Sequence, residues 1–440
     1  MRVFVSEANP LWLVALALVV IALFIVLLVS RRRVEWILLL MIASSAFVGS
    51  TSAIVDSMAA LVRWGAIGLL IFLPLARKGH FYRGAVVFYM IYAFCGFIFL
   101  FNSVSLEWQL QRALLLIATV IAVPSAAIVA AGNPGTLKRF YAEIGIIGCV
   151  VVLVAAFQLP SQIMTADRFA GASKGVPHFA MVLGSLIPFV FLGMWREDKR
   201  LARILFGAAF VTGAFCLFLT AQRAGTLAGV IGIAPLLLTI GMSKKLRIAV
   251  VAVLSVVCLY LLISNLEDSR IRYIQDRYEP KAGLSNREII WGEAMAMISE
   301  NIFIGHGTGA AENTRTSEPS FHNAYLEAWY NAGLIGLLLF IAAQIRALYV
   351  IIALMRSGAA TVKSEIALSL GSVLGICFVG FFESSPAGAS TILVLLFLVV
   401  SSTMEEMYAQ YRMRSVRAGA RSAATFPARS KIISATKSTV

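Results

Sequence analysis

Repeated apolar runs of roughly 20 residues, each long enough to cross a bilayer, constrain the fold of this chain more than any other feature. The chain has 440 residues, of which 60% are hydrophobic and only 13% are charged. A soluble chain of this length would divide into domains with polar surfaces. The sequence therefore predicts an all-α polytopic membrane protein.

The predicted spans number thirteen if the N-terminus lies outside the cytoplasm. They cover roughly 11–30, 35–55, 58–76, 84–102, 112–131, 141–160, 178–195, 202–220, 224–241, 248–264, 324–350, 365–382 and 389–403. The first run lacks a small-residue cleavage site, which indicates a retained span and not a signal peptide. If 35–55 re-enters the membrane or 1–30 does not cross it, the number is twelve with both ends inside. We expect about 12–13 transmembrane helices.

Short connections rich in Lys and Arg alternate with connections that carry few cations. The basic clusters fall at 31–33, 77–83, 138–139, 196–203, 244–247 and 356–363, and in the C-terminal tail. Cationic short loops stay in the cytoplasm, so the other connections, including residues 265–321, face the opposite side. In a bacterium this side is the periplasm. The net charge of +15 follows from this arrangement, and no motif predicts a nucleic-acid partner.

These runs divide the chain into four parts. Residues 1–264 form an N-terminal transmembrane bundle, and residues 265–322 form a long periplasmic loop with short helices. Residues 323–403 form the C-terminal transmembrane helices. Residues 404–440 form a basic cytoplasmic tail, which we expect to be a disordered, solvated segment, with contact to anionic lipid headgroups as the alternative.

The long polar loop concentrates groups that hold anions and move protons. It contains Arg270, Arg272, Arg277, Lys281, Arg287 and Arg315, together with His306 and His322. A membrane protein tolerates such a segment only where it meets water. The combination indicates an active site.

Two residues of this loop have positions that suit anion binding or proton transfer. Arg287 follows Ser285 in an S-x-x-E capping box and would open an amphipathic helix near the membrane surface. Its partner is either a bound anion or an acid in a surface ion pair. His322 opens the next helical run, where the helix dipole favours a neutral imidazole that can act as a general base. The simpler alternative is a helix-capping histidine.

Three more residues lie in connections predicted on the outer side. Arg223 has no acid within eight residues, and a guanidinium at this depth needs an anionic partner or a water-filled cavity. Arg168 is a similar cation with Asp167 adjacent. Glu383 is either an acid that supports the site or a solvated residue at the end of a span.

Other patterns carry little chemistry. Gly305-His-Gly-Thr-Gly309 follows no strand and lacks a Walker lysine, so it predicts a flexible turn and not a nucleotide site. Gly171-Ala-Ser-Lys-Gly175 matches a nucleophile elbow by letter only, because no strand precedes it. The five cysteines lie inside apolar runs, without metal-type spacing. We expect no metal, no cofactor and no disulfide.

Taken together, several segments resemble one family. In order, they are Arg168-Phe-Ala-Gly171, Arg223-Ala-Gly225, Arg287-Glu-Ile-Ile-Trp291, Gly305-His-Gly-Thr-Gly309, His322-Asn-Ala-Tyr-Leu326 and Gly333-Leu-Ile-Gly336. This combination resembles the O-antigen ligase and polysaccharide polymerase family of bacterial inner-membrane glycosyltransferases. The match covers roughly residues 165–340. Ile302, where the family often has proline, and His178, where asparagine is common, depart from it.

The resemblance implies a GT-C-like fold and metal-independent, inverting transfer of a glycan from a polyprenyl-diphosphate donor at the periplasmic face of the inner membrane. By the same resemblance, His322 deprotonates the acceptor hydroxyl, and Arg223 and Arg287 hold the donor diphosphate. The expected substrate contacts are Arg168, Asn323, Tyr325, Arg270 and Arg272.

Three alternatives remain at this point. A ligase would use the lipid A core as acceptor, whereas a polymerase would use another lipid-linked glycan. A transporter of lipid-linked glycans would place its ionisable groups near the bilayer midplane, and here they crowd one face. A structural assembly subunit would not need His322 or the arginines.

Overall fold

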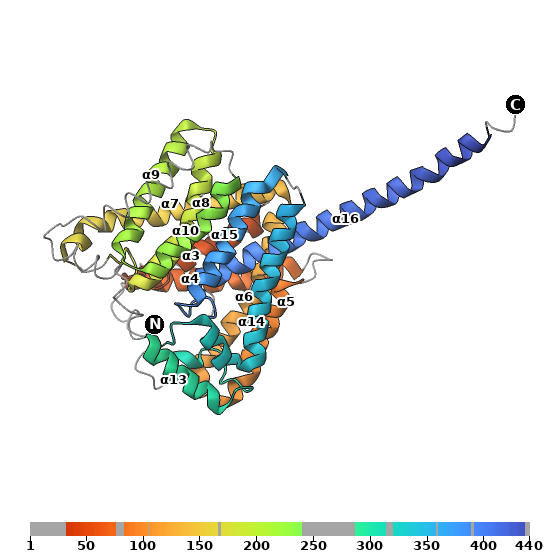
Figure 1. The fold of residues 1–440 in the computed structure, drawn as a ribbon. Helices are drawn as coiled ribbons and strands as arrows, with labels where there is room; N and C mark the ends of the chain where they lie inside the picture. The colour runs from red at the N-terminus through yellow and green to blue at the C-terminus, as the bar shows by residue number, and fades with distance from the viewer. Residues whose placement is uncertain are drawn as a thin grey trace.

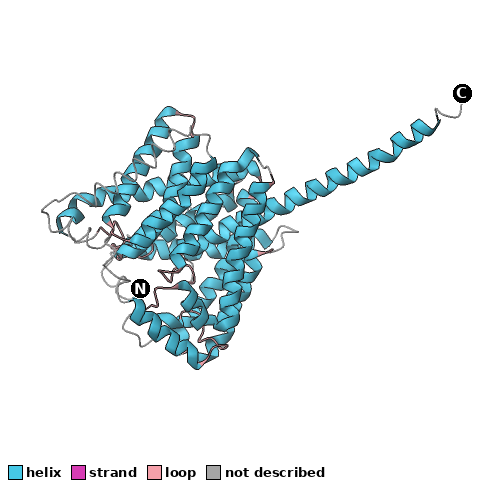
Figure 2. Cartoon of the chain, in the orientation of Figure 1, coloured by secondary structure: helices cyan, strands magenta, loops and turns pink. Residues whose placement is uncertain are grey.

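The computed structural model describes residues 32–75, 83–103, 105–165, 169–239, 287–313, 320–357, 360–388 and 391–435. These residues form helices joined by turns, and among them the only β-type pairing is an isolated bridge between Ser50 and Ser173 (Figure 2). The predicted all-α class is confirmed. Spans 11–30 and 248–264 lie outside the described residues, so the total of 12–13 spans stays a prediction.

The predicted spans within the described residues coincide largely with helices, except that 35–55 runs past the end of α3 at Phe47 and through a turn to the start of α4. The α-helices are α3 (Arg33–Phe47), α4 (Ala53–Leu75), α5 (Ala85–Ile98), α6 (Leu106–Ala131), α7 (Pro134–Thr165), α8 (Val176–Arg196), α9 (Arg200–Leu219), α10 (Arg223–Thr239), α13 (Arg287–Glu300), α14 (Ala324–Arg356), α15 (Lys363–Gly380) and α16 (Ile392–Ala435). Three 3-10 turns accompany them: η1 (Phe99–Asn102), η3 (Ala310–Asn313) and η4 (Ala360–Val362). Nine of these described helices are long and apolar enough to cross a bilayer, and α10 is a shorter apolar helix.

Close backbone contacts hold α10 between α8 and α15 (Figure 1). A Cβ atom built on Gly184 of α8 would meet the Gly225 carbonyl oxygen at 2.2 Å. One built on Gly371 of α15 would meet the Gly232 oxygen at 2.1 Å. Small residues let membrane helices approach this closely. The packing fixes the first turn of α10, which begins at Arg223.

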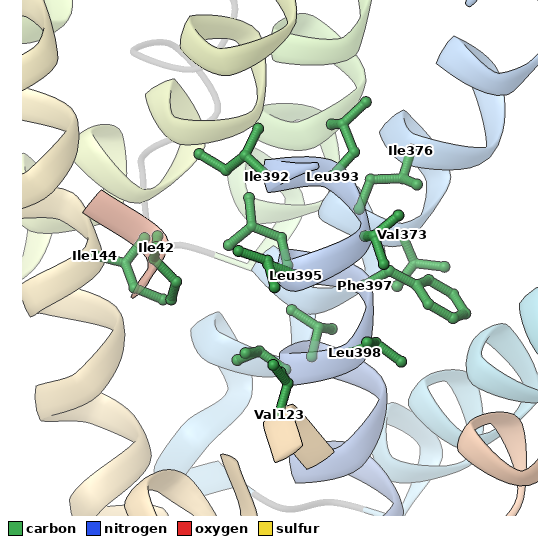
Figure 3. Packing of buried hydrophobic residues seen from close by; sticks show 14 of the residues in the cluster. Ile42, Val123, Ile144, Val373, Ile376, Ile392, Leu393, Leu395, Phe397 and Leu398 are labelled. Atoms are coloured by element: carbon green, nitrogen blue, oxygen red, sulfur yellow. The ribbon is translucent and has the colours of Figure 1, made fainter. Parts of the chain in front are cut away.

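The first half of α16 occupies the centre of the bundle. Its apolar side chains belong to one buried cluster with Ile42, Val123, Ile144 and Val373 from four other helices (Figure 3). The helix then continues beyond the bundle to Ala435 (Figure 1). The boundary predicted after residue 403 thus falls inside a helix, and the tail expected to be disordered is helical as far as Ala435.

Ion pairs join residues that the predicted spans place at or near the same end of the bundle. At the end predicted to be cytoplasmic, Arg346 pairs with Glu405 (Nε to Oε1, 2.8 Å), and Arg196 pairs with Glu365. At the other end, Lys174 pairs with Asp56 (Nζ to Oδ2, 2.7 Å). These three pairs agree with the predicted alternation, and the sidedness of the connections stays a prediction.

Two exposed residues test which end faces the periplasm. In a variant whose five natural cysteines are replaced by alanine, Asn301→Cys is expected to react with a membrane-impermeant thiol reagent in intact cells with a permeable outer membrane. Asp198→Cys, in the basic turn between α8 and α9, is expected to react only after the inner membrane is opened, because cationic loops stay inside. The reverse labelling pattern would contradict the predicted orientation.

Candidate functional site

A buried carboxylate, Glu383, lies at the end of the bundle where the turns that carry Gln222 and His322 meet. Glu383 follows α15 and is only 4% exposed. Its Oε1 accepts hydrogen bonds from Gln222 Nε2 at 2.7 Å and from an Arg287 guanidinium nitrogen at 3.2 Å. Its Oε2 lies 3.5 Å from His322 Nδ1. Gln222, Arg287, His322 and Glu383, together with Arg223 next to Gln222 in the sequence, are called the Glu383 cluster below.

Helix α13 positions Arg287. Ile290, Ala294 and Ile298 recur every fourth residue, so they share one face of α13, which is buried in a small apolar cluster with Phe321. Trp291 Nε1 also donates to the Phe321 carbonyl oxygen at 3.1 Å. The helix is therefore anchored against the segment that leads to His322.

Arg287 itself forms an ion pair with an acid, one of the two partners expected from the sequence. The pair is not a surface pair, because the side chains of Arg287 and Glu383 are only 19% and 6% exposed. The guanidinium carbon also lies 5.8 Å from the centre of the Phe382 ring. Ser285, the first residue of the predicted capping box, lies outside the described residues.

His322 lies just before α14 and not in its first turn, so its predicted position was wrong. Asn323 is the N-cap, and its Oδ1 accepts hydrogen bonds from the backbone N–H groups of Tyr325 and Leu326 at 2.9 and 3.1 Å. Asparagine is a strong N-cap residue, which places the helix start one residue later. The helix dipole therefore acts on His322 from outside the helix.

The backbone of His322 is held in an unusual conformation. Its φ is +49°, in the left-handed region that residues with a side chain adopt at a cost of about 1–2 kcal/mol. Its N–H donates to Ser320 Oγ at 3.2 Å, and the Ser320 and Ser384 hydroxyls lie 2.8 Å apart. Backbone strain of this kind concentrates at functional sites. The imidazole is 31% exposed beside the buried Glu383 carboxylate.

The turn between α9 and α10 places a second arginine directly after Gln222 in the chain. Ala221 has a φ of +48°, and Gln222, which is 9% exposed, reaches Glu383. Arg223 follows as the half-buried first residue of α10. Two arginines and one carboxylate give the cluster a net charge of about +1 with a neutral imidazole, which suits an anionic ligand.

Asn323 and Tyr325 support the turns in this structure. The Asn323 amide caps α14 and donates to the Phe381 carbonyl oxygen at 3.3 Å. The Tyr325 hydroxyl donates to Gln344 Oε1 at 2.9 Å and to the Cys377 carbonyl oxygen at 3.0 Å. Their substrate contacts stay predictions, as do those of three arginines outside the described residues, namely Arg168, Arg270 and Arg272.

The glycine-rich segment 305–309 is a packed turn and not the flexible one expected. A Cβ on Gly305 would meet the Asn331 carbonyl oxygen at 2.3 Å. The His306 ring stacks on Tyr330 with centroids 4.2 Å apart. Next to it, Glu312 pairs with Arg112 at 2.7 Å, and burial raises the pKa of this carboxyl. The segment holds the long loop against α6 and α14.

Sequence reasoning did not single out Gln222 and left Glu383 with two readings. Glu383 had a usable signal: it is a lone acid at the end of an apolar span, where a charge needs a partner or water. Gln222 had none beyond its position next to Arg223.

A comparison with known families identifies the segment that carries most of these residues. Residues 208–341 match the family model described as O-antigen ligase. The match begins within α9, ends within α14 and includes Arg223, Arg287 and His322. This segment of the chain is therefore similar to the O-antigen ligase family. No curated protein matches the chain. The predicted resemblance to the O-antigen ligase and polymerase family is thus confirmed, and Glu383 joins the site from outside the matched segment.

Proposed function

We propose that the Glu383 cluster transfers a glycan from a polyprenyl-diphosphate donor to an acceptor hydroxyl, as a metal-independent, inverting glycosyltransferase at the periplasmic face of a bacterial inner membrane. One observation carries this proposal. A buried carboxylate lies beside both an arginine suited to phosphate and a partly exposed histidine suited to a hydroxyl, and this arginine and histidine lie in the segment that matches the O-antigen ligase family.

His322 would act as the general base. In this role the Glu383 carboxylate would accept a hydrogen bond from Nδ1–H, which leaves Nε2 free to take the acceptor proton, and the carboxylate would stabilise the imidazolium that forms. The Nδ1 to Oε2 distance of 3.5 Å is long for a hydrogen bond. Catalytic hydrogen bonds often shorten when substrate binds, and we expect this one to do so.

The arginines would act on the leaving group. The acceptor oxygen bonds to the anomeric carbon as the bond from this carbon to the diphosphate oxygen breaks, so negative charge grows on the diphosphate. Guanidinium groups fixed before the reaction stabilise such charge, and their planar forks match phosphate oxygens. Glu383 fixes Arg287, and the packing of α10 fixes the backbone of Arg223.

The acceptor decides between a ligase and a polymerase. We propose the lipid A core as acceptor, with another lipid-linked glycan as the alternative. The purified protein should be given a lipid-linked donor with each acceptor in turn. A single addition to the lipid A core supports the ligase, and a ladder of longer lipid-linked glycans supports the polymerase. The absence of both products would contradict the proposed function.

Lysine substitutions test whether the arginines grip phosphate. Arg287→Lys and Arg223→Lys are each expected to lower the transfer rate about 10–100-fold, because lysine keeps the charge but loses the planar fork. Transfer is measured on purified, correctly folded protein. Arg200→Lys is the matched control, since Arg200 is an exposed first residue of α9. Wild-type turnover in Arg223→Lys would show that Arg223 makes no specific contact.

A further inference from the structure

A series of hydrogen bonds leads from the backbone of His322 to a buried acid. The His322 N–H donates to Ser320 Oγ at 3.2 Å, and the Ser320 and Ser384 hydroxyls lie 2.8 Å apart. The Ser384 side chain also hydrogen-bonds the carboxyl of Glu327, which lies in the first turn of α14 and is only 2% exposed. Ser320, Ser384 and Glu327 are called the serine network below.

One arrangement of hydrogens gives every donor in the serine network an acceptor. A serine hydroxyl has one hydrogen to donate, while its oxygen can accept, and a carboxyl offers an acceptor oxygen whether or not it carries a proton. Ser320 therefore accepts from the His322 N–H and donates to Ser384, and Ser384 donates to Glu327. All three bonds point the same way, and hydrogen bonds in such a series strengthen one another.

Two adjacent residues thus contact the two parts of His322. The Glu383 carboxylate lies 3.5 Å from the imidazole, and Ser384 reaches the backbone N–H through Ser320. The side chain and the backbone of His322 are therefore both referred to the same turn after α15. A shift of this turn would move the imidazole and its carboxylate together.

Helix α5 fixes this turn in place. The hydroxyl of Tyr89 donates to the Pro386 carbonyl oxygen at 2.8 Å, and that of Tyr92 donates to the Ala387 carbonyl oxygen at 3.2 Å. Both tyrosines are buried in the core of the bundle. The serine network is therefore anchored on a rigid part of the protein, as the support of a precise site requires.

We propose that Ser384 is a positioning residue, which acts through Ser320 to hold the backbone of His322 in its left-handed conformation and so keeps the imidazole beside Glu383 for proton transfer. This inference rests on the proposed function, in which His322 is the general base. A φ of +49° is unfavourable for a residue with a side chain, so bonds to the backbone must keep it populated. Without the serine network the backbone can relax, and the imidazole loses its place.

Removal of either hydroxyl tests this role on the purified full chain in nanodiscs. Ser384→Ala and Ser320→Ala are each expected to lower the turnover number about tenfold, because a small displacement of a catalytic group is costly. The double variant is expected to be no slower than either single variant, since both hydroxyls act on one bond path. Affinity for the lipid-linked donor is expected to be unchanged, because in the proposed mechanism the arginines hold the diphosphate.

The same substitution in a His322→Ala background separates positioning from a general effect on the fold. If Ser384 acts only through His322, Ser384→Ala is expected to slow the residual transfer of His322→Ala no further. Ser385→Ala is the matched control, because the neighbouring Ser385 accepts hydrogen bonds from Thr391 and Gly388 through its backbone carbonyl oxygen, which alanine keeps. Its turnover is expected to equal that of the wild type.

Two results would overturn the positioning role. One is wild-type turnover in Ser384→Ala, or in Ser320→Ala if Ser384→Ala does not fold. The other is a loss of rate that is as large in the His322→Ala background as in the wild type, which would make the serine network a support of the fold alone. Wild-type turnover in His322→Ala would instead contradict the proposed function, because His322 would then not be the base.

Discussion

His322→Ala is expected to lower the rate of glycan transfer about 10²–10⁴-fold, the usual contribution of a general base. Donor affinity is expected to stay within a few-fold of wild type, because in the proposed mechanism the arginines and not the imidazole contact the diphosphate. His322→Gln should be nearly as slow, since an amide can bond the acceptor hydroxyl but cannot take its proton. The measurement is turnover beside donor affinity on the same purified variant.

His306→Ala is the control for this substitution. His306 belongs to the same loop, but it stacks on Tyr330, and its Nδ1 lies 3.3 Å from the Tyr330 carbonyl oxygen. We expect the purified His306→Ala protein to transfer glycan at the wild-type rate. If His322→Ala binds donor normally and transfers within a few-fold of wild type, His322 is not the base.

Glu383→Gln is expected to lower transfer about 10²–10⁴-fold, by the reasoning that applies to the carboxylate of a Ser-His-Asp triad. Glutamine has almost the same shape but no charge. It therefore removes the counter-ion of Arg287 and the group that orients His322 and stabilises its protonated form. Both effects act on the turnover number, which is the quantity to measure.

Two further variants distinguish the proposed role of Glu383 in transfer from a purely structural role. Glu383→Asp keeps the charge on a shorter side chain and is expected to recover part of the rate. Glu300→Gln removes an exposed acid from the last turn of α13 and is expected to change nothing. Equal loss of rate in Glu383→Asp and Glu383→Gln, with an equal fall in melting temperature, would reduce Glu383 to a packing residue.

The membrane-spanning helices could be predicted from the sequence because hydropathy and length decide them locally. The observed bounds of α8, Val176–Arg196, and α9, Arg200–Leu219, differ from the predicted spans by only a few residues. The close approach of α8, α10 and α15 was not predicted, because it depends on which glycines face each other across helices.

The site was predicted only in part, because tertiary packing assembles it. Gln222 and Glu383 are 161 residues apart in the sequence, and Arg287 and Glu383 are 96 apart. No local sequence pattern predicts contacts between residues so far apart in the chain. Arg287 and His322 could be chosen as candidates from the sequence because a cation and an imidazole stand in a polar loop of an apolar chain, and their chemistry stays a prediction.

The error at His322 had a local cause. Asn323 is a better N-cap than histidine, and this preference was readable from the sequence. The flexible turn expected at 305–309 had a different cause. Its glycines serve close packing against α14 and not mobility, a distinction that only the position of Asn331 and its neighbours decides.

Transfer by the purified protein in a metal chelator tests the central claim most directly. The full chain in nanodiscs is given a polyprenyl-diphosphate-linked glycan and an acceptor, and the glycan transferred and the polyprenyl diphosphate released are both counted. We expect equal amounts, with the anomeric configuration inverted and the rate unchanged by the chelator. No transfer to any acceptor, or transfer that requires a divalent metal, would contradict a glycosyltransferase that uses Arg223, Arg287 and His322.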